Sequence, residues 1–470
     1  MTFLKTSENI TPITILDSAI KLLDPKPTII PDILKPDQYG TRFNFLKYEM
    51  SKEDWDKLPS DVQEKYVEEI FSFYRLVWGF PYAFKTRDTF AWKFGVLPEI
   101  DKWVEDIIQN LYQKDFEKYS KQAHRLRNFA SPDLIDNTDE EDAEYDGGFF
   151  DETCVDTETC RHLKQNLLGM GVPNAFMPHL HHTPVKNMMS PHEGFFDDVK
   201  FKKAIHLACR WDSGAWPHSI RYGLRSIGGI QSVGNFKPTV AKFLYERYTP
   251  DEGGIVYDFS CGWGGRLTGA RSSKKNIRYV GVDPSVKTFE CLQNVDAFMC
   301  DRFGYTPGSI VKGSVSGKET DQYRSEFVQI TNCGSEDFRD PDLIGKIDFA
   351  FSSPPYFDLE DYASGDTGYE NQSHVKFPGR DRWLNGFLKQ TADNVYAMLK
   401  AGGTCGLNLA DFRDTEIVGE AIKVFESAGL KYCQEDNYEM RISVRTGNRS
   451  TEKLKDKKHK TETIFIFHKS

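Results

Sequence analysis

The stretch VYDFSCGWGGRLTGA, residues 256–270, decides the fold. An apolar run ends at Asp258, glycines follow at positions 262, 264 and 265, and a helical pattern begins directly after them. A glycine-rich turn between a strand and a helix lets the backbone approach a ligand at the carboxyl end of a parallel sheet. Such turns also occur where a strand and a helix only pack tightly, so this stretch alone does not establish a ligand site, and other motifs must support it.

From residue 235 onward, strand patterns alternate with helical patterns, which is typical of a parallel sheet wound by helical crossovers. This predicts an α/β, Rossmann-like fold with a mainly parallel, helix-flanked sheet. The expected strands are 253–260, 278–285, 346–353, 404–412 and 461–469, and the expected helices are 236–248, 285–304, 382–403 and 414–430.

The chain before residue 234 has a different texture. Apolar residues recur at helical spacing over 51–80 and 98–126, which predicts a mostly helical N-terminal domain. Twelve acidic residues and no Lys or Arg lie between Asp133 and Glu158, as in a solvated linker or loop. We therefore divide the chain into four parts. Residues 1–130 form a helical domain that is a candidate for target recognition, and residues 131–160 form an acidic linker. Residues 161–233 form a connecting region with possible nucleic-acid contact, and residues 234–470 form the Rossmann-like domain.

Composition restricts the class of protein. No apolar stretch approaches the roughly 18 residues of a membrane span, and the beginning of the sequence is unlike a secretory leader, so we expect a cytoplasmic protein without a membrane partner. Nine scattered cysteines without a C-x-x-C pair indicate reduced thiols. The net charge of −10 opposes a nucleic-acid partner, but the acidic run carries this excess and 441–460 is strongly basic.

A second acid supports a ligand at the glycine turn. Asp283 ends the next predicted strand about 20 residues after the glycines, where an acid in such folds binds ribose hydroxyls. The glycine turn and Asp283 together indicate a cofactor that contains a nucleoside, but they do not distinguish a dinucleotide from S-adenosylmethionine. In GSEDF, Asp337 and Phe338 are candidates for the adenine amine and face, and the alternative is a surface loop whose Phe only packs.

The segment SSPPYF, residues 352–357, follows a predicted strand that should end in the same crevice. The two prolines remove N–H donors and direct carbonyls outward, notably that of Pro354. Ser353 adds an acceptor, and the ring of Tyr356 can stack on a flat base, which contributes about 1–3 kcal/mol. The turn therefore suits an exocyclic amino group.

Together these motifs resemble the S-adenosylmethionine-dependent DNA amino-methyltransferases, which act on cytosine N4 or adenine N6 and carry a [DNS]-P-P-[YFW] tetrapeptide. The resemblance covers residues 234–470 and includes GNFKP, residues 234–238. It implies Ser353, Pro354, Pro355 and Tyr356 as catalytic residues, and Lys237, Pro238, Asp258, Phe259, Gly262, Trp263, Gly264, Asp283, Pro284, Asp337 and Phe338 as binding S-adenosylmethionine.

The same resemblance implies duplex DNA as the partner, with the target base flipped out. Serine at the first motif position favours cytosine N4 over adenine N6. Three alternatives stay open: an RNA base amino-methyltransferase, transfer of a modified group from a sulfonium donor, and an inactive nucleic-acid-binding protein. The polar segment after the tetrapeptide, 358–383, is a candidate lid.

No metal site is predicted. The run HLHH, residues 179–182, with His192 nearby, lacks the spacing of a zinc site. Cys261, beside the glycines, is interpreted as a small packed residue.

Overall fold

The computed structural model describes residues 52–73, 117–129, 162–163, 167–210, 217–359, 362, 368–411, 415–441 and 461–470. The chain divides into one unit of residues 1–118 and 174–234 and a second of 119–173 and 235–470. The domain boundaries that the sequence suggested, after residues 130, 160 and 233, stay predictions. The acidic run at 133–158 and the basic run at 441–460, apart from Arg441, lie outside the described residues.

The described part of the first unit is mostly helical. The apolar spacing predicts the helices over 52–73, whereas those between 178 and 226 lie in the expected connecting region. Trp55 and Ile70 are buried, and the Trp55 ring meets that of His206 edge to face at 5.5 Å. Gly223 approaches the backbone of Ala204 so closely that a Cβ would lie 2.5 Å from its carbonyl oxygen. The helices are α2 (Lys52–Lys57), α3 (Ser60–Phe73), η6 (Pro178–His181), α7 (Pro191–Phe196), α8 (Asp198–Cys209) and α9 (Pro217–Ser226), and α6 (Gly171–Phe176) crosses the division.

The second unit contains one large sheet with the strand order β1-β10-β11-β8-β7-β2-β3-β6-β5-β4, and β9 also pairs with β11. The strands are β1 (His162–Leu163), β2 (Gly253–Asp258), β3 (Asn276–Val282), β4 (Ser309–Val315), β5 (Lys318–Arg324), β6 (Val328–Thr331), β7 (Ile347–Ser352), β8 (Leu399–Asn408), β9 (Lys431–Tyr432), β10 (Tyr438–Arg441) and β11 (Thr461–His468).

The five central strands are parallel and lie in the order β6-β3-β2-β7-β8. Numbered along the chain, this is the order 3-2-1-4-5 of a doubly wound sheet, and it reverses between β2 and β7. Tyr257 of β2 pairs with Ala350 of β7, so both strands end at the same edge. The predicted Rossmann-like fold is therefore confirmed.

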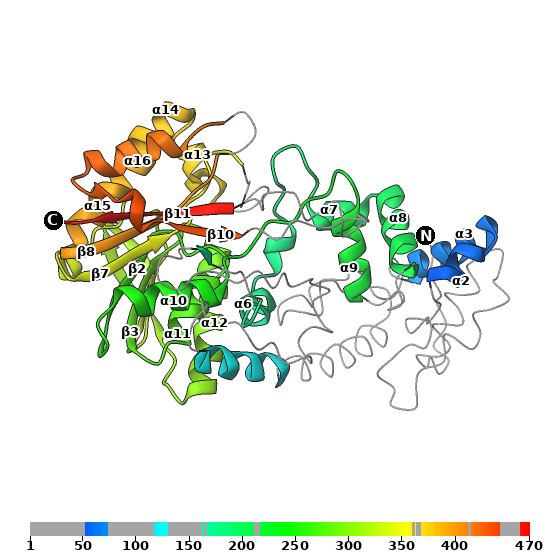
Figure 1. Ribbon diagram of the computed structural model, residues 1–470, viewed down its shortest axis with the longest axis horizontal. Coiled ribbons are helices and arrows are strands. Elements are labelled where there is room, and N and C mark those ends of the chain that lie inside the picture. Colours follow the sequence, from blue (N-terminus) through cyan, green and yellow to red (C-terminus); the bar gives the residue numbers. More distant parts are fainter. Residues whose placement is uncertain are drawn as a thin grey trace. The chain divides into compact units, whose positions relative to one another are not determined.

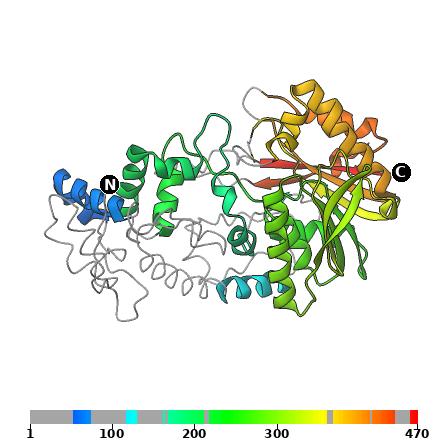
Figure 2. The same cartoon turned by 180° about the vertical axis from the view of Figure 1, so that it is seen from behind.

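Helices cover both faces of this sheet (Figures 1 and 2). One face carries α10 (Pro238–Tyr248), α11 (Gly265–Arg271) and α12 (Val286–Phe303), and the other carries the π-helical turn η9 (Trp383–Leu388), α15 (Lys389–Met398) and α16 (Val418–Ser427). A buried cluster from Tyr257 on β2 to Phe467 on β11 fills the second interface. Because both faces are covered, all six β7 residues are buried.

Short elements complete the second unit. They are a helix over 117–128, η7 (Pro341–Leu343), η8 (Tyr369–Asn371), α13 (Ser373–Lys376), α14 (Arg380–Arg382) and η10 (Gln434–Asp436). Within the part of the chain that the structure describes, no helix combines the length and the apolar character needed to cross a membrane.

Two details differ from the sequence-based expectation. The predicted helix over 382–403 ends at Met398, because β8 begins at Leu399 and includes the glycines that we took as a helix stop. The hairpin of β4 and β5 extends the sheet beyond β6 with antiparallel strands, where no strands were expected.

Candidate functional site

The glycine turn after β2 is held open by its backbone conformation and by the preceding segment. Gly262 and Gly264 have φ angles of 55° and 78°, in the left-handed region that favours glycine. Asn235 donates to the Trp263 carbonyl at 2.8 Å and accepts from the Gly265 N–H at 3.2 Å. A Cβ on Gly265 would lie 2.0 Å from the Phe236 carbonyl oxygen. The GNFKP segment, with Lys237 and Pro238 opening α10, thus lies against the turn.

Asp258, at the end of β2, is fully buried and its carboxylate is saturated. Oδ2 accepts from Arg266 Nε at 2.8 Å and from the Tyr279 hydroxyl at 2.6 Å. Oδ1 accepts from the Ser352 hydroxyl at 2.8 Å and from the Ser260 N–H at 3.3 Å. A carboxylate has about four acceptor positions, so none remains for a ligand. This differs from the expected direct contact with a cofactor and makes Asp258 a positioning residue.

Asp283 is placed differently. It follows β3, accepts the Gly262 N–H at 3.1 Å and the Ser285 N–H at 3.0 Å, and keeps acceptor positions on both oxygens. Burial raises the pKa of Asp283 to about 7, although these two N–H groups favour the charged form. Of the two predicted acids that follow β2 and β3, Asp258 and Asp283, only Asp283 can still accept hydrogen bonds from hydroxyl groups beside the glycine turn.

Ser352 connects the two motifs. It is the last residue of β7 and fully buried, and its hydroxyl lies 2.8 Å from Asp258 Oδ1 and 3.1 Å from the Ser260 carbonyl oxygen. The hydroxyl thus ties the start of the SPPY tetrapeptide directly to the glycine turn. The residues that directly precede the two turns are therefore in contact at one edge of the sheet.

The tetrapeptide continues into a sharp turn. Phe357 has a φ of 54°, which is uncommon for a bulky residue, and the Leu359 N–H donates to the Tyr356 carbonyl at 3.1 Å. The Tyr356 hydroxyl donates to Glu462 on β11. Ser353 Oγ is 3.4 Å from the Tyr356 hydroxyl, a long contact that leaves its lone pairs available. The half-buried Tyr356 ring is therefore oriented from the last strand of the sheet.

Several predicted residues lie in the core instead. Phe259 is fully buried and packs toward Phe425, and Phe338 is 1% exposed with its ring 5.5 Å from that of Tyr257. For Phe338 the structure favours the packing alternative over stacking on adenine. Trp263 is mostly buried, with its ring 5.7 Å from that of Tyr362. Contacts of these residues with a ligand would come from the backbone or from a ring edge.

The expected lid segment is largely structured where it is described. Lys376 of α13 pairs with Glu336 at 2.6 Å and with Asp337 at 2.5 Å, so the predicted adenine-binding acid is already engaged. Trp383, assigned to the loop, is fully buried, and its indole N–H donates to Ser373 at 3.1 Å. Pro284 is half-buried and follows Asp283 directly.

Sequence reasoning did not identify Asn235, Arg266, Ser352 and Glu462 as site residues. The position of Asn235 in GNFKP and that of Ser352 beside the tetrapeptide were available signals. Glu462 gave no local signal, because it is 106 residues from Tyr356 along the chain.

No protein-family model matches the sequence, and no curated protein is significantly similar to it. Solved structures with similarity include a TehB-like S-adenosylmethionine-dependent methyltransferase from Corynebacterium glutamicum (13% identity, TM-score 0.28, 50% of this chain and 90% of that one). Others are geranyl diphosphate C-methyltransferase from Streptomyces coelicolor (12%, 0.30, 49% and 78%) and TrmN from Thermus thermophilus (12%, 0.29, 50% and 50%). Similarity at this level carries no information about substrate. The cofactor assignment depends on the strand order and on the residues at the switch point.

Proposed function

We propose that the chain is an S-adenosylmethionine-dependent methyltransferase acting on the exocyclic amino group of a DNA base, with cytosine N4 favoured over adenine N6. One observation carries the proposal. The hydrogen bond from Ser352 to Asp258 joins the proline-framed turn to the glycine turn where the strand order reverses, which is where open α/β sheets bind ligands. A donor and an acceptor bound at these two turns would be neighbours.

The residues at the glycine turn fit the proposed cofactor. S-adenosylmethionine supplies a methyl group on a positively charged sulfur. The left-handed Gly262 and Gly264 allow the backbone to approach a ligand, and Asp283 offers carboxylate oxygens to ribose hydroxyls beside them. Asn235 holds the turn in this conformation from the opposite side.

The SPPY turn fits an amino group on a flat ring. Ser353 Oγ and the Pro354 carbonyl are acceptors for the two amine hydrogens, and the Tyr356 ring offers a stacking surface. Because the Tyr356 hydroxyl donates to Glu462, the ring cannot turn freely away from the base. An orientation fixed in advance lowers the entropy cost of binding the acceptor.

The chemistry assigned to the chain is orientation and electrostatic stabilisation. The lone pair of an aryl amine is delocalised into the ring, so the amine is a weak nucleophile. Two acceptors that hold its hydrogens favour a tetrahedral nitrogen and free the lone pair. Cys261 is unsuited as a nucleophile, because burial raises the pKa of its thiol well above the ordinary value.

The preference for cytosine rests on Ser353 at the first motif position, through the resemblance to DNA amino-methyltransferases. Since a base inside a duplex hides its amino group, the target must be flipped out, at a cost of a few kcal/mol. Transfer of a modified group in place of methyl uses the same arrangement and is distinguished by the mass of the product.

The proposal is tested by mass spectrometry of nucleosides from duplex DNA, and separately from structured RNA, incubated with the chain and S-adenosylmethionine. We expect N4-methylcytosine in DNA, at least about 100-fold less with Ser353→Ala and a large loss with Tyr356→Ala. Ser427→Ala, on the exposed side of α16, is the matched control and should retain full activity. Modified RNA with unmodified DNA would contradict the proposed substrate, and undiminished product from both site variants would contradict the assigned roles.

A further inference from the structure

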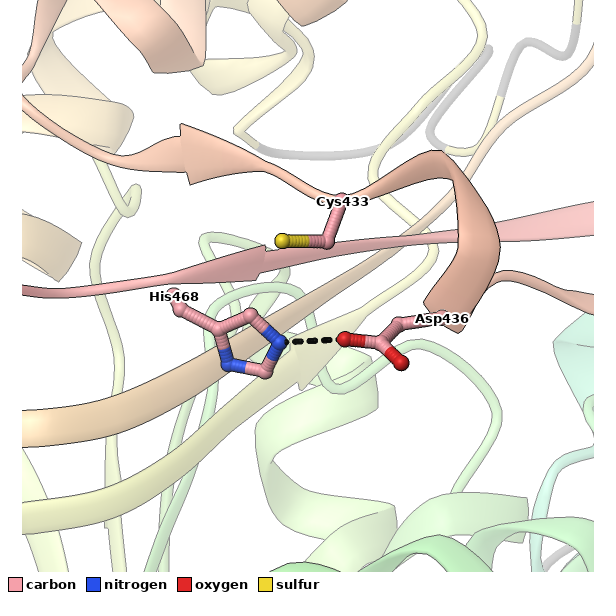
Figure 3. A group of neighbouring side chains, drawn as sticks. All are labelled: Cys433, Asp436 and His468. Carbon is pink, nitrogen blue, oxygen red and sulfur yellow. Dashed lines mark hydrogen bonds and ion pairs between the residues drawn. The ribbon is translucent and has the colours of Figure 1, made fainter.

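A second group of chemically active side chains lies away from the proposed site, around the end of β11. Cys433 follows β9, Asp436 ends η10 and His468 ends β11, and one ligand atom from each lies within 4.8 Å of the others (Figure 3). From Glu462 at the proposed active site to His468 is six residues along β11, about 20 Å. The group is therefore separate from the methyl-transfer site.

The backbone holds these three residues in place. The Cys433 N–H donates to the Ile466 carbonyl at 2.9 Å, and the Asp436 N–H donates to the Cys433 carbonyl at 3.0 Å. The Ile466 N–H in turn donates to Asn437 Oδ1 at 3.0 Å. The Cys-x-x-Asp turn is thus tied to β11 on both sides, so its two side chains face His468 before any ligand binds.

The side chains are those that zinc prefers. Thiolate, imidazole and carboxylate are all Zn²⁺ ligands, and a spacing of two residues between the first pair recurs in zinc sites. Three protein ligands leave a fourth tetrahedral position for water. The side chains of His468 and Asp436 are 34% and 30% exposed, so an ion and a water molecule can reach them.

The surroundings of His468 match those of a metal-bound imidazole. Nδ1 lies 3.2 Å from the hydroxyl of the buried Thr404, while Nε2 lies 2.7 Å from Asp436 Oδ2. When Nδ1–H donates to Thr404, the Nε2 lone pair faces a carboxylate, an arrangement that requires a proton or a cation between them. A second hydrogen bond on the other ring nitrogen is the usual support of a metal-ligating histidine. The simpler alternative is an Nε2–H donated to Asp436 with no ion.

We propose that Cys433, Asp436 and His468 bind one Zn²⁺ ion, with water as the fourth ligand. The ion would join the connection between β9 and β10 to the last strand. This differs from the expectation of no metal site, which rested on the histidine run at 179–182, on His192 and on the absence of a C-x-x-C pair. The inference does not depend on the methyltransferase proposal.

The test is a Co²⁺ titration of the full-length, untagged and metal-free chain, followed by absorption spectroscopy. We expect one equivalent to give tetrahedral d–d bands and a thiolate-to-cobalt charge-transfer band, both removed by excess Zn²⁺. Cys433→Ser should abolish the charge-transfer band, and His468→Gln should weaken binding at least about 10-fold. Cys333→Ser, which changes the other half-buried thiol of the described residues, should leave the spectrum unchanged.

A thermal measurement keeps the proposal falsifiable if a variant folds poorly. At 100 times its Kd, Zn²⁺ should raise the Tm of the unaltered chain and of Cys333→Ser by about 4 °C. A wild-type chain that shows neither the charge-transfer band nor a Tm shift would overturn the proposal. So would a charge-transfer band that persists in folded Cys433→Ser, because the bound thiolate would then be another cysteine.

Discussion

Substituting alanine for two adjacent serines should affect different properties: Ser352→Ala should lower the stability of the fold, and Ser353→Ala should lower the activity. Ser352 is fully buried, and its hydroxyl is 2.8 Å from Oδ1 of Asp258, which is buried and forms an ion pair with Arg266. A hydrogen bond to a charged group contributes about 1.5–3 kcal/mol. Ser352→Ala removes this bond and leaves Asp258 with the Arg266, Tyr279 and Ser260 N–H contacts. We therefore expect the free energy of unfolding to fall by about 2 kcal/mol.

Ser353 is half-buried, and within the part of the chain that the structure describes its hydroxyl makes one side-chain contact, the long 3.4 Å one with the Tyr356 hydroxyl. Ser353→Ala should change the free energy of unfolding by about 0.5 kcal/mol or less. Because its oxygen is the proposed acceptor for an amine hydrogen, product formation should fall about 100-fold, as for the loss of one oriented polar group in an active site.

Urea denaturation followed by tryptophan fluorescence gives the midpoint and slope for each variant, and nucleoside mass spectrometry gives the rate at a temperature where both are folded. Both variants carry the same Ser→Ala substitution at neighbouring positions and lose the same volume. The general effects of Ser→Ala on stability and activity therefore cancel when the two variants are compared. A stable Ser352→Ala together with a destabilised Ser353→Ala would refute the assignment of the two hydroxyls. Equal activities of folded Ser353→Ala and the unaltered chain would refute the catalytic role.

Three further predictions concern the two turns. Burial raises the pKa of Asp283 to about 7, so its contribution to stability is present at low pH and is lost as the pH rises from about 4 to 7; Asp283→Asn should flatten this part of the urea stability profile and weaken S-adenosylmethionine binding in calorimetry. Gly265→Ala would put a Cβ 2.0 Å from the Phe236 carbonyl, so we expect cofactor binding to be lost in the same titration while the circular dichroism of the sheet persists. Tyr356→Phe keeps the ring but loses the bond to Glu462, so kcat should fall less than with Tyr356→Ala, and equal losses would contradict a stacking role.

The sequence predicted four of the five central strands, because they read as apolar runs, and it missed the short β6, although all four of its residues are buried. β2 and β7 were expected from such runs, and their common edge followed from the rule that parallel strands carry ligands at their carboxyl ends. The β4 and β5 hairpin was missed because its strands are mostly exposed and polar. The sequence nevertheless held a signal in the pair Ser316-Gly317, because glycine is common in two-residue hairpin turns. In the structure these residues have the positive φ angles that such a turn requires, 50° and 78°.

The candidate site was predictable to the level of motifs and not to that of individual contacts. Local sequence placed Gly262, Asp283 and Tyr356 near one another, because each follows a strand of the same sheet. It could not assign Glu462, whose contact with Tyr356 depends on β11 returning antiparallel beside β8. For Phe338 the sequence left stacking on adenine and packing open, and only the packed structure shows that its ring lies against Tyr257 inside the core.

Asp258 illustrates how a motif acid can act without touching a ligand. Its carboxylate accepts hydrogen bonds from Arg266 on α11, Tyr279 on β3 and Ser352 on β7, so three elements are linked to the end of β2. Burying such an ion pair contributes little net stability relative to apolar packing, but removing one partner leaves an uncompensated charge. The pair therefore fixes geometry more than it stabilises the fold. Because the same carboxylate positions both the glycine turn and the SPPY turn, a disturbance at Asp258 should misalign donor and acceptor together, even though neither is in contact with it.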